Sequence, residues 1–209
     1  MNILIADDHA IVREGLKQII KNLPAVSSID EAQEGNEAYA LIRENSYDMA
    51  VLDISMPGLS GLDILQKVRN AGICTRVLIL SVHPEEQYAM RAFKLGASGY
   101  LSKRDAYEEL SLAISKIASG GKYVSSALAE KILFDNPEKA VQNSHVSLSV
   151  REFQVMILLA KGKSVTEIAG ELFLSDKTIS TYRARVLKKM NMKKNAELTL
   201  YAIKYLLIE

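Results

Sequence analysis

Five polar side chains stand where short apolar runs give way to loops. Asp7 and Asp8 follow I-L-I-A, Asp53 follows M-A-V-L, Ser81 ends R-V-L-I-L-S, and Lys103 follows S-G-Y-L-S. An unpaired carboxylate is costly to bury, so each aspartate must face solvent or meet a cation. If the runs are parallel strands, all five side chains lie at the carboxyl edge of one sheet, where open α/β folds bind their ligands.

This set of residue types is suited to phosphoryl transfer. Three converging carboxylates repel one another unless a hard divalent cation lies among them, and Mg²⁺ prefers oxygen ligands and often keeps a phosphate oxygen. Lys103 offers a positive charge and Ser81 a hydroxyl, and both suit a phosphoryl group. We therefore expect Asp53 to accept a phosphoryl group while Asp7 and Asp8 hold the metal.

Each residue taken singly also has an ordinary interpretation. An aspartate after a strand often caps a turn or a helix, as Asp8 could for a helix that starts near Ala10. Lys103 alone could be a solvated loop charge. The occurrence of all five residues at strand ends, in this order, favours the functional interpretation.

The elements that must position these residues alternate along the first 120 residues. Buried parallel strands are predicted at 2–6, 49–53, 76–81 and 98–102, with a weaker one near 28–32. Helical patterns lie between them at 36–44, 61–70, 85–95 and 105–119. In the first helix, one apolar face contains Ile11, Val12, Leu16, Ile19 and Ile20. This alternation predicts an α/β doubly wound, five-stranded parallel sheet.

The net charge of +1 conceals two unlike parts of the chain. Residues 1–143 hold 15 basic and 19 acidic residues, and residues 144–209 hold 11 basic and 6 acidic ones. An acidic part joined to a basic part indicates two domains with different partners, the second suited to nucleic acid. We expect domains at 1–121 and 148–209, joined by a linker at 122–147 that holds a short helix at about 126–134.

The basic domain at 148–209 is predicted to be a small all-α domain. Ser149 and Ser164 each precede a helix and each has a glutamate three residues later, which is the pattern of a capping box. After the turn L-S-D, a third helix is expected at 177–190, with Ile179, Tyr182, Val186 and Met190 on one face. Its opposite face carries Lys177, Ser180, Thr181, Ala184 and Lys188, flanked by Arg185. Such a helix pair fits a DNA major groove, although a bundle with a solvated cationic face would show the same pattern.

The motif I-A-D-D-H…V-L-D-I-S-M-P-G-x-x-G…L-I-L-S…G-A-S-G-Y-L-S-K resembles the receiver domain of two-component response regulators, a flavodoxin-like fold, over residues 1–121. The resemblance implies that Asp53 is the phosphoacceptor and that Ser81 and Lys103 bind the phosphoryl group. It also implies that Mg²⁺ is held by Asp7, Asp8, Asp53 and the backbone carbonyl of Ser55.

The same resemblance makes Tyr100 the switch aromatic that turns inward, and makes Ser55 and His83 tune the lifetime of the phosphate. Most receivers follow the lysine with a proline in a cis bond, but here Arg104 follows Lys103. A cis bond without proline costs about 2.5–4 kcal/mol, so we expect a trans bond and a somewhat different loop.

Residues 148–209, with L-S-x-R-E…E-I-A-x-x-L-x-L-S-x-K-T-I…L-K-K-M, resemble the LuxR-type helix-turn-helix. The whole chain thus resembles the NarL/FixJ class of response regulators. In that class the positions of Ser180, Thr181 and Ala184 point at base edges. The rest of the expected DNA-binding set, mostly phosphate contacts, is Lys177, Thr178, Arg183, Arg185, Lys188 and Lys189.

These features together predict a transcription regulator that a sensor histidine kinase phosphorylates on Asp53, which promotes dimerisation and binding to double-stranded promoter DNA. It would be a stoichiometric, Mg²⁺-dependent phosphoacceptor with slow self-dephosphorylation only, and not an enzyme. A phosphatase of the haloacid-dehalogenase type would need a second aspartate where Ser55 stands, and the glycine-rich motifs of nucleotide-binding enzymes do not occur. A protein-interaction regulator that binds no DNA remains an alternative.

Two further expectations concern location and assembly. No signal peptide follows Met1 and no apolar run approaches the roughly 20 residues of a membrane span, so we expect a cytoplasmic protein without membrane contact. Helical spacing near the C-terminus gives an apolar stripe that consists of Leu198, Tyr201, Ala202, Tyr205 and Leu206. This stripe could face a second copy of the chain, or it could only pack on the preceding helices.

Overall fold

The computed structural model describes residues 1–82, 85–126, 128–129, 144–205 and 207–208. The chain divides into two compact units, Met1–Ile132 and Leu133–Glu209. No helix among the residues described is long and apolar enough to cross a membrane.

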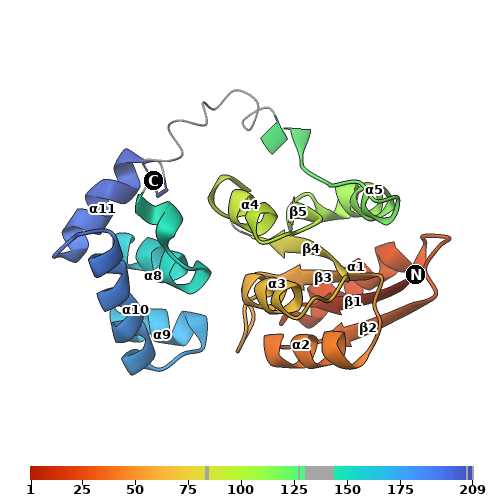
Figure 1. Ribbon diagram of the computed structural model, residues 1–209, viewed down its shortest axis with the longest axis horizontal. Helices are drawn as coiled ribbons and strands as arrows, with labels where there is room; N and C mark the ends of the chain where they lie inside the picture. Colours follow the sequence, from red (N-terminus) through yellow and green to blue (C-terminus); the bar gives the residue numbers. More distant parts are fainter. Residues whose placement is uncertain (83–84, 127, 130–143, 206, 209) are drawn as a thin grey trace. The chain divides into compact units, whose positions relative to one another are not determined.

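The first unit is built on a five-stranded sheet in which all strand pairs are parallel, in the order β2-β1-β3-β4-β5 (Figure 1). The strands are β1 (Asn2–Ala6), β2 (Ser28–Ala32), β3 (Met49–Asp53), β4 (Arg76–Ser81) and β5 (Gly99–Ser102). β3 is buried along its whole length, as expected for a central parallel strand covered on both faces. The predicted doubly wound, five-stranded parallel sheet is confirmed.

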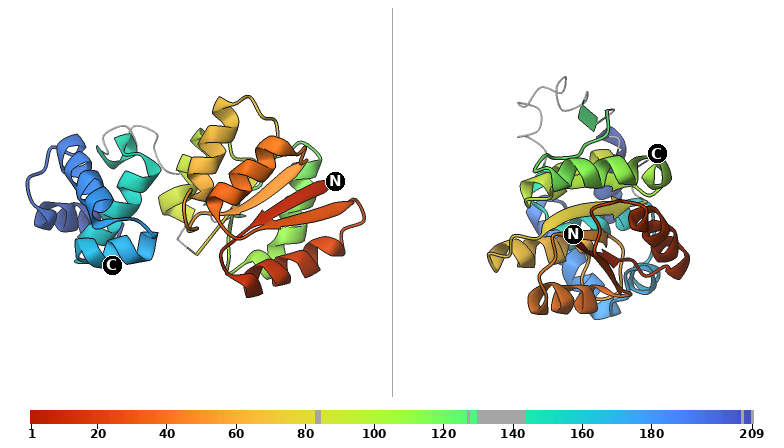
Figure 2. Two further views of the ribbon diagram at one scale, coloured as in Figure 1. Left: turned by 90° about the horizontal axis from the view of Figure 1, so that it is seen from below. Right: turned by 90° about the vertical axis from the view of Figure 1, so that its right-hand side faces the viewer.

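Helices cover both faces of this sheet (Figure 2). They are α1 (Ala10–Lys21), α2 (Gly35–Glu44), α3 (Gly61–Asn70), α4 (Glu85–Lys94) and α5 (Ala106–Ala118). α1 packs beside α5 and α2 beside α3. One core cluster joins alternate residues of β1 and β3 to Leu16 and Ile20 of α1 and to Leu110, Ile114 and Ile117 of α5.

The predicted apolar face of α1 needs one correction. Ile11 is 89% exposed, whereas Arg13 is only 7% exposed. Arg13 shares the inward face with Leu16 and Ile20, three and seven residues further on, because these spacings return to the same side of a helix. An apolar residue therefore points to solvent, and a cation takes an inward position.

The junction after α5 differs in detail from the expected linker. Tyr123 lies in the core of the first unit, and its hydroxyl donates to Glu109 Oε2 at 2.5 Å. Of the helix expected at about 126–134, Ser126, Leu128 and Ala129 are helical, and the remainder lies outside the described residues. The predicted domain limits at 121 and 148 stay predictions.

The second unit contains η1 (Ser144–Ser147), α8 (Val150–Ala160), α9 (Val165–Leu172), α10 (Asp176–Lys189) and α11 (Asn195–Lys204). Both expected capping boxes are present, at Ser149 and at Ser164. α10 begins at Asp176, one residue before the predicted start, because the Ser175 side chain accepts the Thr178 backbone N–H and caps the helix.

The apolar stripe near the C-terminus packs in large part within its own unit. Leu198 and Ala202 are fully buried, and the rings of Tyr201 and Tyr205 lie 4.4 Å apart by their centroids. Tyr201 also contacts His145, with 2.8 Å between its hydroxyl and Nδ1. The apolar side chains that α11 exposes are different ones, Leu200 and Ile203, and Leu206 lies outside the described residues.

Candidate functional site

Three aspartates converge at the carboxyl edge of the sheet. Asp7 follows β1 directly, and Asp53 is the last residue of β3; these are adjacent strands. Asp7 and Asp53 are 0% and 2% exposed, and Asp8 is half-buried. One ligand atom from each of these residues and from His9 lies within 4.8 Å of the others. This group is therefore compact enough to hold one cation.

Lys103 is the cation that faces these carboxylates. Its Nζ lies 2.8 Å from Asp53 Oδ2 and 2.6 Å from Asp7 Oδ2. Burial alone would lower the pKa of Lys103, but the two carboxylates outweigh it and the pKa is raised. Lys103 therefore stays charged and offsets much of the repulsion between the buried acids.

Asp53 is a carboxylate on which burial and its neighbours act in opposite directions. Its pKa is raised overall. Burial is the largest cause and Asp7 adds to it, while Lys103 and the Ser55 backbone N–H oppose the rise without cancelling it. Its Oδ1 is buried and has no hydrogen-bond partner among the described residues. A buried oxygen without a partner costs free energy, so binding of a cation or of a covalent group at this oxygen would be favourable.

Ser81, a further predicted site residue, lies at the same edge. Ser81 is fully buried at the end of β4, its carbonyl accepts the Lys103 backbone N–H at 2.8 Å, and it pairs in register with Ser102 of β5. Tyr100 is fully buried on β5. The Lys103–Arg104 bond is trans, as predicted, and His83 lies outside the described residues.

The loop after β3 holds Asp53 by close backbone packing. A Cβ at Gly61 would lie 2.3 Å from the Asp53 carbonyl oxygen, so only glycine lets the start of α3 approach the strand end. Gly58 has a backbone φ of +76°, a conformation that residues other than glycine rarely adopt. Ser60 then caps α3 through a capping box with Asp63. The run P-G-L-S-G thus serves as a rigid support for the strand end.

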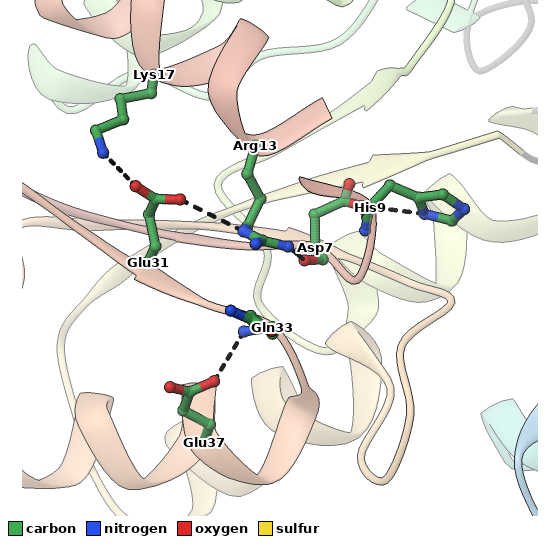
Figure 3. A network of polar contacts seen from close by, with 7 residues as sticks. All are labelled: Asp7, His9, Arg13, Lys17, Glu31, Gln33 and Glu37. Carbon is green, nitrogen blue, oxygen red and sulfur yellow. Dashed lines mark hydrogen bonds and ion pairs between the residues drawn. The ribbon is translucent and has the colours of Figure 1, made fainter. Parts of the chain in front are cut away.

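Two residues near the acids were missed by the sequence analysis. His9 Nδ1 lies 2.7 Å from Asp8 Oδ1, and its backbone N–H donates to Asp7 Oδ1 at 2.9 Å. Arg13 Nη1 donates to the Asp7 backbone carbonyl at 2.7 Å (Figure 3). The sequence signal that could have indicated Arg13 is its spacing, because a charged residue three and seven positions before Leu16 and Ile20 falls on the buried face of the helix.

The donor set fits a hard divalent cation. Its three aspartates offer carboxylate oxygens, one of them the unpartnered Oδ1 of Asp53, and His9 offers an imidazole nitrogen. Oxygen is the ligand that Mg²⁺, Ca²⁺ and Mn²⁺ prefer. The cluster can therefore bind such an ion beside a carboxylate that can act as a nucleophile.

A second candidate site lies on α10. Ile179 and Val186 are buried, and the opposite face is exposed along its length, with Lys177, Ser180, Thr181, Ala184, Arg185 and Lys188. The Thr181 hydroxyl donates to the Lys177 carbonyl at 2.9 Å, so it can offer a partner only its lone pairs and its methyl group. A basic exposed face on the second helix of a tight helix pair is suited to a DNA groove.

Besides Thr181, three of the expected DNA-binding residues make side-chain contacts within the unit. Arg183 Nε donates to Asn195 Oδ1 at 2.8 Å, and Lys189 Nζ lies 2.6 Å from Glu152 Oε2. The Thr178 and Ser175 hydroxyls are 2.8 Å apart. These contacts orient α10 in its own unit, and they leave Lys177, Arg185 and Lys188 as its freer cations.

Two family models match the chain. Residues 3–115 match the response regulator receiver domain, and residues 146–202 match the bacterial regulatory proteins of the luxR family. The response regulator UvrY of Escherichia coli (strain K12) is 36% identical over 207 residues, which are 98% of this chain and 94% of that protein. The oxygen regulatory protein NreC of Staphylococcus epidermidis is 36% identical over 217 residues and the full length of both chains.

A solved structure is similar over nearly the whole chain. It is that of RcsB from Salmonella enterica serovar Typhimurium, bound to promoter rprA in the presence of the phosphomimetic BeF3⁻. The TM-score is 0.66 at 25% sequence identity, and the match covers 96% of this chain and 97% of that one.

Proposed function

Because the chain belongs to the NarL/FixJ class of two-component response regulators, we propose that Asp53 accepts a phosphoryl group from a sensor histidine kinase and that this modification controls DNA binding. The observation that carries the proposal is the state of Asp53, a buried carboxylate at a strand end with one unpartnered oxygen and a lysine on the other.

The chemistry follows from the charges around Asp53. A carboxylate oxygen of Asp53 attacks phosphorus, the new P–O bond forms, and the P–N bond to the donor imidazole breaks. Asp53 must be ionised to react, and Lys103 favours that form against the effect of burial. Lys103 and the Ser81 hydroxyl would then bind phosphoryl oxygens.

Mg²⁺ is the cation we assign to the acidic cluster. Asp7, Asp8 and Asp53, with the backbone carbonyl of Ser55, would hold it. When bound, it would neutralise charge that develops on the transferred phosphoryl group. The protein consumes one phosphoryl group per site and releases it only by slow hydrolysis, so it acts as a stoichiometric acceptor.

We assign α10 to the major groove of double-stranded promoter DNA. The exposed face of α10 and the basic balance of residues 144–209 support this role, as does the similarity to RcsB bound to a promoter. Ser180, Thr181 and Ala184 would face base edges, and Lys177, Arg185 and Lys188 would contact phosphates. A regulator of bacterial promoters acts in the cytoplasm.

Phosphorylation would act by promoting a dimer. A single helix-turn-helix buries only about 600–1,000 Å² on DNA, and two linked copies gain affinity without any new base contact. The exposed Leu200 and Ile203 of α11 are the apolar side chains that a second copy could cover. Tyr100, as the switch aromatic, would bias the receiver toward the dimer-forming state.

The phosphoacceptor assignment can be tested by labelling. The full-length chain and its Asp53→Asn variant are incubated with Mg²⁺ and phosphoramidate, and intact mass is recorded. We expect one added phosphoryl group on the native chain and none on the variant. Asp48→Asn is the matched control, because Asp48 directly precedes the amino end of the same strand, where its Oδ2 accepts the Asn2 backbone N–H. Undiminished labelling of Asp53→Asn would refute the assignment.

A further inference from the structure

Arg13 is a buried cation on a helix face that is otherwise apolar. It is 7% exposed, and an isolated buried guanidinium would be strongly destabilising. Its partners compensate for this cost. Nη1 donates to the Asp7 backbone carbonyl at 2.7 Å, and Nε lies 3.4 Å from Glu31 Oε2 (Figure 3).

The carbonyl that Arg13 binds belongs to the peptide joining the two acids. The Asp7 backbone N–H donates to the Ala32 carbonyl at 3.3 Å, and there the chain leaves the sheet. Because a peptide unit is planar, fixing the Asp7 carbonyl fixes the plane between Asp7 and Asp8. The orientation of that plane determines the direction in which both carboxylates leave the backbone.

Glu31 anchors this arrangement and balances its charge. It lies on β2, where it pairs in register with Ile5 of β1, one strand away from the acids. It also forms an ion pair with Lys17, one turn after Arg13 on α1. A bare guanidinium beside the acidic cluster would repel a divalent cation, and the Glu31 carboxylate offsets that repulsion.

We propose that Arg13 is a positioning residue for the metal-binding acids. Arg13 holds the Asp7–Asp8 peptide plane through the Asp7 carbonyl. Glu31 in turn fixes the position of the Arg13 guanidinium and neutralises its charge. This inference rests on the proposed function of the acidic cluster as a Mg²⁺ site. Arg13 itself touches neither the metal nor the phosphoryl group.

The test compares two neighbouring cations on α1 that share Glu31. Arg13→Met and Lys17→Met are made in the full-length chain, and Mn²⁺ binding is followed by the EPR signal of the free ion, with Mg²⁺ as competitor. We expect about 10-fold weaker binding for Arg13→Met, the usual effect of losing a residue that orients a metal ligand. Lys17→Met should bind as the native chain does, since Lys17 has no contact with Asp7.

Two more variants test the mechanism. Arg13→Lys keeps the charge and one donor and should recover part of the lost affinity. Glu31→Gln keeps an acceptor for Arg13 but removes the neutralising charge, so it should weaken metal binding less than Arg13→Met does. If Arg13→Met does not fold, the Mn²⁺ affinities of Arg13→Lys and Glu31→Gln are compared with that of Lys17→Met instead.

The possible outcomes separate the two proposals. A native chain that binds no Mn²⁺ would reject the metal site itself. Native-like binding by the Arg13 and Glu31 variants, together with a lower urea midpoint, would mean that Arg13 only stabilises the fold, and the inference would be wrong.

Discussion

At the scale of single residues, the site depends on the charge balance around Lys103. The strand-end spacing predicted that Asp7, Asp8 and Asp53 would meet, and the structure brings them together with Lys103. Arg13 escaped prediction because helical periodicity marks apolar residues and does not say which polar side chain finds a buried partner. Ile11 was misassigned for the same reason, since periodicity alone cannot place the edge of a helix face.

Removing Lys103 should reveal how much the acids depend on it. Lys103→Ala leaves Asp7 and Asp53 buried without their cation, so unfolding free energy should fall by about 3–5 kcal/mol in the absence of divalent ions. Mg²⁺ should restore part of this stability, and the metal affinity should not fall. Urea titrations with and without Mg²⁺ measure both effects. A large drop in Mg²⁺ binding by this variant would contradict the assigned role.

At the scale of elements, most helices and strands follow from periodicity and capping signals. α10 starts one residue earlier than predicted because Ser175 was read as part of a turn and not as a cap. The C-terminal stripe could not be assigned from sequence, since packing and association favour the same apolar spacing. Only the tertiary structure shows that Leu198 and Ala202 face inward and that Leu200 and Ile203 face outward.

The glycine at the start of α3 should matter for the reaction as well as for stability. Gly61→Ala introduces a Cβ 2.3 Å from the Asp53 carbonyl oxygen, which must displace the strand end. We expect lower stability and slower labelling by phosphoramidate. Gly15→Ala is the control, because nothing lies within 4 Å of its Cβ and alanine should stabilise α1 by about 1 kcal/mol. Unchanged labelling of Gly61→Ala would mean that the loop is more adaptable than proposed.

Two adjacent lysines of α10 should behave differently. Lys188→Ala removes an exposed cation, so it should weaken binding to all DNA sequences and flatten the salt dependence by about 0.9 for each phosphate that is no longer neutralised. Lys189→Ala removes the partner of Glu152, so it should lower the stability of the second unit and change the salt slope less. Equal salt slopes for both variants would show that the Glu152 pair does not hold Lys189 away from DNA.

The Glu152 pair also predicts a pH dependence. Burial raises the pKa of Glu152, but Lys189 and the Ser149 cap outweigh it and lower the pKa below its ordinary value of 4.5. The stability it contributes is therefore complete above pH 4.5 and is lost as the pH falls through the lowered pKa. Glu152→Gln should unfold more easily than the native chain at pH 7, and the difference should shrink below pH 4.5. A difference that is constant from pH 7 to pH 3 would exclude this linkage.

At the scale of the whole molecule, the proposal is that a phosphoryl group on Asp53 controls DNA binding by the second unit. The sequence predicted both activities because each has its own motif. Their coupling has no motif of its own, because it depends on a population shift; we expected it from the two domains together and from the resemblance to the NarL/FixJ class.

The direct test is the affinity of the full-length chain for genomic DNA fragments that it selects, with and without phosphoramidate and Mg²⁺ at fixed salt. We predict tighter binding after phosphorylation for the native chain and for Asp48→Asn, footprints with two half-sites, and no response from Asp53→Asn. Equal affinity of the phosphorylated and unphosphorylated native chain, on a single half-site, would contradict the proposal.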